Sequence, residues 1–359
     1  MEAGTWRPAP PIAWVGNTTG AASFARYEGM PTGTMTVNEA VIESTGARFS
    51  NGTIEFDIKP LGYNDAGIIF RRHGTDSGEF FYLRANPDCP AANDCIQYAP
   101  ITHTHMQWDI YADMQRPAQI SPTGWNHVRL VVAGEKMLVF INRETTPALV
   151  IPKLQGLTKD GGIAFKGPAI YANLTIRSDF PAALPEVSEA PPEPGTVTTW
   201  DAAAPTVASA PAVLATDIPG PAAWHPIAAE ATGLVNLTRA FARASAPIST
   251  GWLRMTVTAT ADTRRAIRIG WARQVSVFLN GRLVFSGVNP YRPSDHRLSP
   301  DGRLEADNAS IPLDLRKGRN EIVLAVGDSW LTGDGIVKAS PYGWAAEAHF
   351  DDLTGIALR

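Results

Sequence analysis

The feature that most constrains the fold is a two-residue hydrophobic alternation that recurs in short runs along the chain. In the run from Gly52 to Lys59, Ile54, Phe56 and Ile58 alternate with charged residues. Successive side chains of a strand point to opposite faces of its sheet, so this run predicts a strand with one buried face. Similar runs follow at close spacing, with turn residues between them and few helical patterns. The sequence therefore predicts an all-β fold of antiparallel sandwich or jelly-roll type.

Composition supports this prediction and bounds the partners. The chain has 31 Gly and 29 Pro, which suit many tight turns, and its 359 residues suit two domains rather than one core. The net charge of -4, with Lys and Arg scattered along the chain, argues against a nucleic-acid partner. No apolar run approaches the roughly 18 to 20 residues that a membrane span needs.

A proline-rich segment divides the chain. Residues 180–195 contain five prolines and three glutamates, a composition that disfavours sheet pairing and favours an extended spacer. We therefore expect one β-sandwich over residues 1–179, a linker over 180–198, and a second β-sandwich over 199–359.

The two cysteines bear on the compartment. Cys89 and Cys95 are separated by five residues that include proline and asparagine, a spacing that favours a small disulfide loop over two free thiols. A disulfide would indicate an oxidising compartment. The chain start has neither the basic nor the apolar region of a signal peptide, so either the protein is cytoplasmic or a leader has been removed. The cysteine pair favours a periplasmic or secreted protein.

The first half resembles a known superfamily over about half of the chain. The strand-like segments that carry the resemblance are Asn51–Lys59, Ala66–Arg71, Phe81–Arg84, Ile96–Tyr98 and Trp125–Arg129. They resemble the concanavalin A-like superfamily, and within it laminin-G-like modules and the related domain of 3-keto-glycoside hydrolases. The resemblance implies two stacked, curved sheets whose concave face commonly binds sugar.

A sugar-binding concave face would use arginine and tyrosine. Arginine offers a planar fork of donors, and tyrosine offers a stacking ring with a polar tip. The residues that we place on this face are Arg71, Tyr82, Arg84 and Tyr98, with Phe81 and Leu83 facing the core. The alternative is that the arginines are ordinary solvated strand residues.

Catalytic and metal motifs are weak in this half. Glu55 and Asp57 match the first two acids of the Glu-x-Asp-x-x-Glu signature of laminarinase-type glucanases, but the third is missing, which disfavours a retaining glycosidase. His103 and His105 could share a strand face, yet no third metal ligand is recognisable, so we expect surface histidines. We expect His127 to be structural.

The second half resembles the galactose-binding-like β-sandwich. The matching segments are Val277–Phe285, with the hairpin signal Asn280-Gly281, Leu313–Leu324, and the closing Gly343-Trp344 with Phe350. In that family ligands usually meet loops at one end of the sandwich, although many members only pack against a neighbouring domain. The aromatic candidates for ligand binding are Tyr291, in the loop over Asn289–Arg297, Trp330, and Trp108 of the first half.

One enzyme motif can be rejected. Gly327-Asp328-Ser329 resembles the nucleophile block of SGNH esterases, which opens an α/β domain with its histidine more than a hundred residues later. Only thirty residues follow Ser329 here, and β-sandwich strands precede it. A serine nucleophile without its base would be inactive.

These patterns favour an exported carbohydrate-recognition or accessory protein that binds an oligo- or polysaccharide on the concave face of the first domain. The first alternative is a hydrolase acting on glycosides or polysaccharides, with its site on that domain or at the domain interface. The second is a structural or adhesion protein. Calcium often stabilises both superfamilies, so the resemblance implies a structural calcium ion, at a site that no recognisable loop motif locates.

Overall fold

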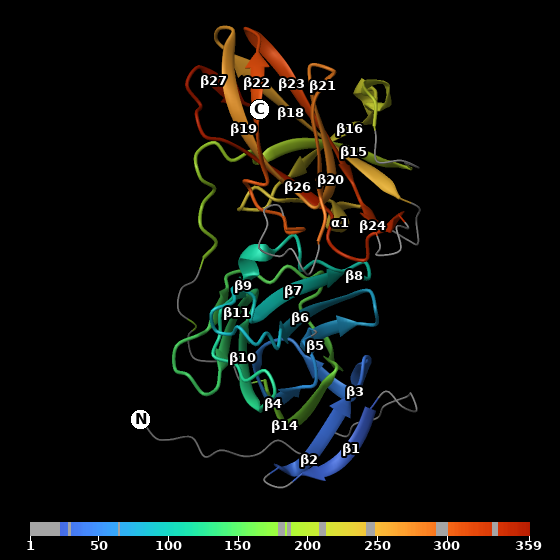
Figure 1. Ribbon diagram of the computed structural model, residues 1–359, viewed down its shortest axis with the longest axis vertical. Helices are drawn as coiled ribbons and strands as arrows, with labels where there is room; N and C mark the ends of the chain where they lie inside the picture. Colours follow the sequence, from blue (N-terminus) through green and yellow to red (C-terminus); the bar gives the residue numbers. More distant parts are fainter. Residues whose placement is uncertain are drawn as a thin grey trace. The chain divides into compact units, whose positions relative to one another are not determined.

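The computed structural model describes residues 22–27, 30–63, 65–178, 184, 188–207, 213–241, 248–291, 301–331 and 337–359. The chain divides into two compact units (Figure 1). Unit 1 comprises Met1–Thr104 and Asp113–Glu189, and unit 2 comprises His105–Ala112 and Ala190–Arg359. The eight-residue segment His105–Ala112, which falls within the expected first domain, thus belongs to unit 2. Within the described ranges, secondary structure is almost entirely strand, which confirms the all-β, antiparallel prediction.

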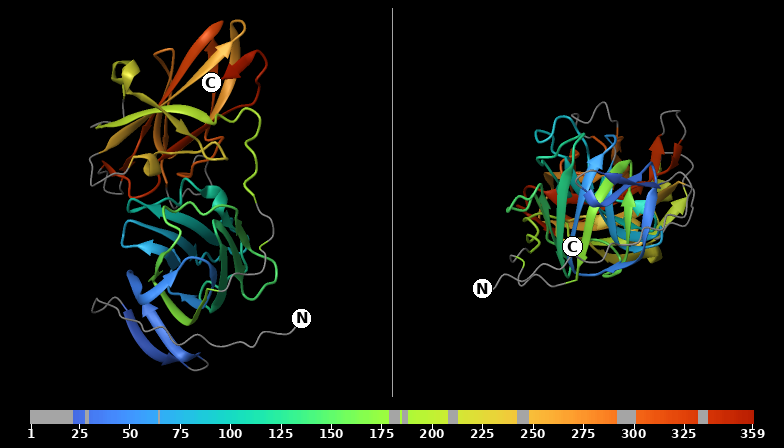
Figure 2. Two further views of the ribbon diagram at one scale, coloured as in Figure 1. Left: turned by 180° about the vertical axis from the view of Figure 1, so that it is seen from behind. Right: turned by 90° about the horizontal axis from the view of Figure 1, so that it is seen from below.

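Unit 1 contains two antiparallel sheets (Figures 1 and 2). The first, which we call the β4 sheet, has the order β1 (Ala22–Tyr27), β2 (Met30–Val37), β14 (Ala169–Arg177), β4 (Gly52–Pro60), β10 (Asn126–Ala133), β11 (Lys136–Ile141) and β12 (Leu149–Ile151). The second, the β6 sheet, has the order β3 (Val41–Phe49), β13 (Gly161–Lys166), β5 (Ala66–His73), β6 (Ser77–Leu83) and β7 (Ile96–Thr102), and β9 (Gln115–Arg116) also pairs with β7. The 3-10 helix η1 (Ala112–Met114) precedes β9.

The core of unit 1 lies between these sheets and follows the alternation in the sequence. Ile54, Phe56 and Ile58 of β4 are fully buried. Phe56 meets Phe165 of β13 edge to face, with ring centroids 6.2 Å apart. Glu55 and Asp57, which alternate with these three residues on β4, are only partly buried, so the predicted half-buried strand is confirmed.

Unit 2 is a second pair of antiparallel sheets. The larger has the order β16 (Trp224–Ala228), β15 (Thr199–Val207), β18 (Ser249–Ala259), β23 (Gly318–Gly327), β20 (Arg273–Leu279) and β21 (Arg282–Asn289), with β27 (Ile356–Leu358) pairing with β18. The smaller has the order β17 (Val235–Asn236), β26 (Ala345–Phe350), β19 (Thr263–Trp271) and β22 (Ala309–Leu315). The short elements are β8 (His105–Met106), η2 (Ala215–Asp217), η3 (Pro221–Ala223), α1 (Leu237–Ala240), and the hairpin of β24 (Ser329–Leu331) and β25 (Val337–Ala339).

The core of unit 2 contains large aromatic and aliphatic side chains from both sheets. Trp200, Leu253, Ile269 and Trp344 are among its buried members. Asn280 and Gly281 both have positive φ, as the predicted tight turn between β20 and β21 requires. No helix in the described part of the chain is long and apolar enough to cross a membrane.

Strand register places one set of loops of unit 2 together. Trp271, at the end of β19, pairs with Ala346 near the start of β26, and Ile269 pairs with Ala309 at the start of β22. Arg273 at the start of β20 pairs with Asn289 at the end of β21. The loops that follow β21 and precede β22 and β26 therefore emerge at the same end of the sandwich, which we call the loop end.

Candidate functional site

Two of the residues predicted for the concave face lie on the core side of the β6 sheet. Tyr98 is directly opposite Phe81 in the β6–β7 pairing, so it shares the face that packs into the core. Its hydroxyl donates to Glu79 Oε2 at 2.5 Å and accepts from the backbone N–H of Gln155 at 2.7 Å. Arg71 Nη1 lies 4.0 Å from Glu79 Oε1. Arg71 and Tyr98 are fully buried, so they stabilise the interior at this position.

The other two lie on the opposite face of the same sheet. Tyr82 pairs with Gln97, and its hydroxyl donates to Gln97 Oε1 at 2.7 Å. Arg84 donates to the same oxygen at 2.7 Å and to the Tyr82 hydroxyl at 3.0 Å. Tyr82 is fully buried, and Arg84 is 9% exposed. The four predicted residues therefore do not share one face, and only Tyr82 and Arg84 could line a surface together.

A bulge explains why simple alternation placed Arg71 with Tyr82. The β5–β6 register shifts between Phe70 and His73, and Arg71 has a φ of 50°. A bulge inserts an extra residue and rotates the following side chains. The guanidinium of Arg71 consequently points inward and donates to the carbonyl oxygens of Ser50 and Gly134.

Cys89 and Cys95 are joined by a disulfide with a Cα–Cα distance of 5.9 Å. The bond closes the loop between β6 and β7, where the N–H of Arg84 also donates to the carbonyl of Cys95 at 2.9 Å. The disulfide thereby fixes the backbone beside Arg84.

Two other predicted residues meet at the loop end of unit 2. Trp108, from the His105–Ala112 segment, contacts Tyr291 edge to face with ring centroids 4.8 Å apart, and Tyr342 at 5.7 Å. Trp108 is buried, whereas both tyrosines are partly exposed. The guanidinium carbon of Arg303 lies 5.6 Å from the centre of the Trp108 ring. We call these four residues the aromatic cluster.

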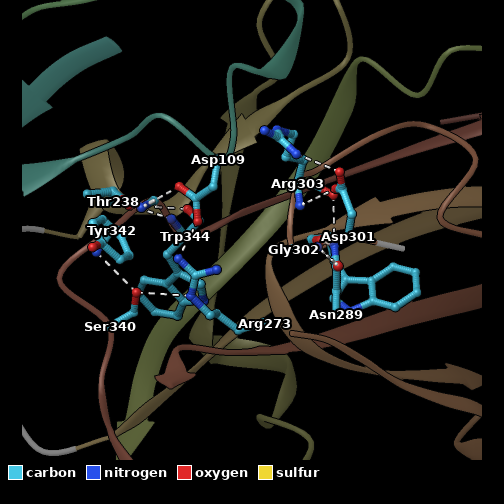
Figure 3. A network of polar contacts seen from close by, with 12 residues as sticks. Asp109, Thr238, Arg273, Asn289, Asp301, Gly302, Arg303, Ser340, Tyr342 and Trp344 are labelled. Atoms are coloured by element: carbon cyan, nitrogen blue, oxygen red, sulfur yellow. Dashed lines mark hydrogen bonds and ion pairs between the residues drawn. The ribbon is translucent and has the colours of Figure 1, made fainter. Parts of the chain in front are cut away.

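A buried ion pair holds the segment that carries Trp108 (Figure 3). Asp109 pairs with Arg273, and both side chains are almost completely buried. Asp109 also accepts a hydrogen bond from the N–H of Gly343 at 2.9 Å. Arg273 Nε donates to Ser340 Oγ at 2.9 Å, and the same oxygen accepts from the N–H of Tyr342 at 3.0 Å. One network therefore positions Trp108 and Tyr342.

Burial dominates the electrostatics of the Asp109–Arg273 ion pair. Burial raises the pKa of Asp109, and the charge of Arg273 and the N–H of Gly343 oppose the rise without cancelling it. Removing one partner would leave a buried charge without compensation, at a cost of about 3–5 kcal/mol. The pair thus makes the position of Trp108 depend on Arg273.

Asn289 forms a second set of hydrogen bonds at the aromatic cluster (Figure 3). Its Nδ2 donates to the carbonyls of Trp271 and Arg303, both at 2.8 Å, and its Oδ1 accepts from the N–H of Gly302 at 2.6 Å. Arg303 Nη1 donates to Asp301 Oδ2 at 2.6 Å. These bonds fix the backbone next to Tyr291 and the guanidinium beside Trp108.

A second anchor holds the far end of the segment. The Tyr111 hydroxyl donates to Glu230 Oε1 at 2.7 Å and accepts from Asn236 Nδ2 at 3.0 Å and Arg239 Nη2 at 3.1 Å. Burial raises the pKa of Tyr111 well above its usual value, and the charge of Glu230 adds to the rise. The hydroxyl therefore stays protonated and can donate to Glu230.

The remaining candidates carry less information. Trp330 lies on β24, but its side chain is outside the described residues, as are residues 292–300 of the loop that follows Tyr291. Ser329 is buried at the start of β24, directly after the last long sandwich strand. His103 Nδ1 lies 3.8 Å from Asp76. The described ranges contain no group of three or more His, Cys, Asp or Glu side chains that could hold a metal ion.

Sequence reasoning missed Asp109, Arg273, Arg303 and Tyr342. The sequence gives no local signal for Asp109 and Arg273, because 164 residues separate them. Tyr342 directly precedes the Gly343-Trp344 pair that carried the family resemblance, so its position was the one usable hint.

No protein-family model matches the sequence, and no curated protein matches it. Among solved structures, the chain is similar to the carbohydrate-binding module CBM66 from Bacillus subtilis, with 15% identity over 45% of this chain and 95% of that chain and a TM-score of 0.32. It is also similar to a galectin-like fold protein from Bacillus subtilis, with 14% identity over 43% and 85% and a TM-score of 0.30.

A third similarity is to domain 4 of AbnA, a GH43 extracellular arabinanase from Geobacillus stearothermophilus in complex with arabinotriose. The identity is 12% over 45% of this chain and 79% of that chain, with a TM-score of 0.28. These values assign neither a family nor a function. The β-sandwich assignment rests on the strand pairing of the chain itself.

Proposed function

We propose that this protein is a carbohydrate-recognition protein whose glycan site is the aromatic cluster of unit 2. The observation that carries the proposal is the pair of partly exposed tyrosines, Tyr291 and Tyr342, that both contact buried Trp108. A sugar ring has an apolar C–H face and hydroxyl edges. Aromatic rings next to a guanidinium and a carboxylate, here Arg303 and Asp301, complement both parts.

The rigidity of the cluster supports binding. Asp109, Arg273 and Asn289 hold its members through buried hydrogen bonds, so little side-chain freedom would be lost when a ligand arrives. A preorganised site loses less conformational entropy on binding, which favours affinity.

Charge favours a neutral glycan. Asp301, Glu305 and Asp307 lie on the loop that precedes β22, and Glu305 and Asp307 are exposed. The carboxyl group of Glu305 is nevertheless partly desolvated, which raises its pKa, and the nearby charges of Asp301 and Asp307 add to the rise. This clustering of carboxylates would repel uronates and other acidic sugars.

We also propose a second, less accessible glycan-binding surface on unit 1. Tyr82, Arg84 and Gln97 form one polar group on the β6 sheet, although their burial means that a glycan could contact them only after the residues covering them move. Export to the periplasm or the cell exterior is also part of the proposal, supported by the Cys89–Cys95 disulfide.

A glycan array with the intact chain, followed by calorimetry on the oligosaccharides that bind, tests the proposal. We expect Tyr291→Ala and Tyr342→Ala each to weaken binding at least about tenfold, as removal of a central aromatic contact does. Tyr63→Ala is the matched control, because Tyr63 is a 48% exposed tyrosine of unit 1.

Three outcomes would count against the proposal. Absence of binding to any glycan would favour the adhesion alternative. Release of shortened products from a bound polysaccharide would favour the hydrolase. Loss of binding in Arg84→Ala, with the tyrosine variants unaffected, would move the site to unit 1.

A further inference from the structure

Unit 1 presents a cluster of polar side chains on the outer face of the β4 sheet, away from the core. The register pairs His127 of β10 with Asp57 of β4, and Thr175 of β14 with Glu55. The side chains of Glu55, Asp57 and His127 are 15%, 16% and 23% exposed. Together with Asn173 and Arg177 they form what we call the β4 cluster.

Asp57 fixes the ring of His127. Its Oδ1 lies 2.8 Å from His127 Nδ1, and its Oδ2 accepts from Asn173 Nδ2 at 2.6 Å. Burial raises the pKa of Asp57. The hydrogen bonds from His127 and Asn173 and nearby positive charge lower it by more than burial raises it, so the net shift of the pKa is downward. An ionised carboxylate can only accept, so Nδ1 carries the proton.

The backbone of β14 is distorted where it supplies Asn173. The β4–β14 register shifts between Ala172 and Thr175, and Asn173 has a φ of 52°. Asparagine tolerates this conformation better than most residues, and bulges are common where a sheet re-aims a side chain toward a site. The distortion places the Asn173 amide against Asp57.

Glu55 faces the free side of the histidine ring. Its Oε1 accepts from Arg177 Nη2 at 2.8 Å, and its Oε2 lies 3.8 Å from His127 Nε2. That separation is too long for a hydrogen bond. Within the described residues, Nε2 makes no hydrogen bond, so this ring nitrogen and the Glu55 oxygen stand side by side on a partly exposed sheet face.

We propose that Glu55 and His127 form a second ligand site, which binds adjacent hydroxyls of a neutral sugar. A hydroxyl can both donate and accept, so one hydroxyl would hydrogen-bond with His127 Nε2 and the other would donate to Glu55 Oε2. The 3.8 Å spacing of Nε2 and Oε2 suits neighbouring hydroxyls on one ring. This site lies in unit 1 and does not rest on the aromatic cluster.

Charge and ligand count favour a sugar over a cation. Arg177 is paired with Glu55, and Arg143 lowers the pKa of Asp57 through its charge, so the two carboxylates are compensated. Three of the four carboxylate oxygens already have partners in Arg177, His127 and Asn173. A divalent cation would require several free oxygens.

The test is an NMR titration of the intact chain that follows the Cε1–H resonance of His127, assigned by its loss in His127→Asn. The probes are neutral trisaccharides of glucose, galactose, mannose, xylose and arabinose. We expect at least one to shift the resonance saturably. Glu55→Gln should weaken that binding at least about tenfold, because a hydrogen bond to a charged acceptor is replaced by one to a neutral amide.

Glu43→Gln is the matched control. Glu43 accepts from Arg72 at 2.8 Å on unit 1, as Glu55 does from Arg177, and its side chain is 60% exposed. Sugar binding that weakens equally in Glu55→Gln and Glu43→Gln would overturn the proposal. A His127 resonance that none of the five trisaccharides shifts would also overturn it. Calcium chloride is titrated as a separate probe, and a resonance that shifts only with calcium chloride would overturn the proposal as well.

A further variant separates this site from the one proposed for unit 2. Tyr291→Ala should leave the His127 titration unchanged. If it abolishes the shift, the resonance reports binding at unit 2 and the β4 cluster is not a site. If array binding persists while His127 never responds, the β4 cluster fails and the aromatic cluster stands.

Discussion

The aromatic cluster of unit 2 and the β4 cluster of unit 1 are assembled in opposite ways. In the β4 cluster, Glu55, Asp57 and His127 come from neighbouring strands, and the sheet register alone brings them together. In the aromatic cluster, Trp108 and Tyr291 come from loops 183 residues apart (291 − 108), and no sheet pairing joins them.

This difference determines what each cluster depends on. The β4 cluster requires only that its sheet forms, because a formed strand pair fixes which side chains are neighbours. The aromatic cluster also requires the His105–Ala112 segment, held by Asp109 and Tyr111, to occupy its place in unit 2. Perturbing that segment should therefore affect unit 2 strongly and the β4 cluster little.

The most severe perturbation is to remove the segment. A fragment of residues 190–359 lacks Asp109 and Tyr111, so Arg273, Arg239 and Asn236 lose partners together. We expect amide hydrogens of β26 and β19 to exchange at least about a hundredfold faster than in the full chain, since more than one buried contact is lost. Hydrogen-exchange mass spectrometry would measure this, and adding a peptide of residues 104–113 should restore part of the protection.

An equal exchange rate in the fragment and the full chain would contradict this account of unit 2. It would also favour the simpler boundary expected from the sequence, with every element of the second sandwich located after the 180–198 linker.

A single substitution should have a smaller effect in the same direction. Asp109→Ala leaves Arg273 buried without its partner, so we expect the free energy of unfolding of unit 2 to fall by about 3–5 kcal/mol. Urea denaturation would measure it. Asp314→Ala is the control, because its ion pair with Arg264 is exposed and should contribute about 0–1 kcal/mol. Similar losses in both variants would mean that the buried pair is not a special anchor.

The sequence predicted the fold because the relevant signals are local. The alternation of Ile54, Phe56 and Ile58 determines which face of β4 is buried, whatever the strand pairs with. Asn280-Gly281 specifies a tight turn through its own backbone preferences. Neither signal depends on a distant segment.

The sites were predicted less well because they depend on register and topology. Tyr98 lies on the core side because it pairs with Phe81, and Arg71 points inward because of a bulge; the sequence specifies neither feature. Trp108 and Tyr291 were each chosen as candidates, but nothing in the sequence indicated that they touch. His127 was expected to be structural, and its contact with Asp57 became visible only once β4 and β10 were paired.

The smallest expected effect concerns the β4 cluster and its dependence on pH. The folded-state pKa of Asp57 is lower than the unfolded value, near 3.9, because His127 and Asn173 favour the ionised form more than burial disfavours it. Asp57 therefore contributes stability that is fully present above pH 4 to 5 and is lost as the pH falls through the folded-state pKa.

Asp57→Asn should remove this contribution, so the stability of unit 1 should fall less steeply than in the wild type between pH 5 and pH 3. At neutral pH the variant should be about 1 kcal/mol less stable, the size of a hydrogen bond to a partly exposed charged group. Denaturation curves over that pH range would measure both effects, with Glu43→Gln as the control for loss of a unit 1 carboxylate. A variant with the wild-type slope would show that Asp57 does not hold His127 through its charge, and the ring orientation that turns Nε2 toward Glu55 would lose its basis.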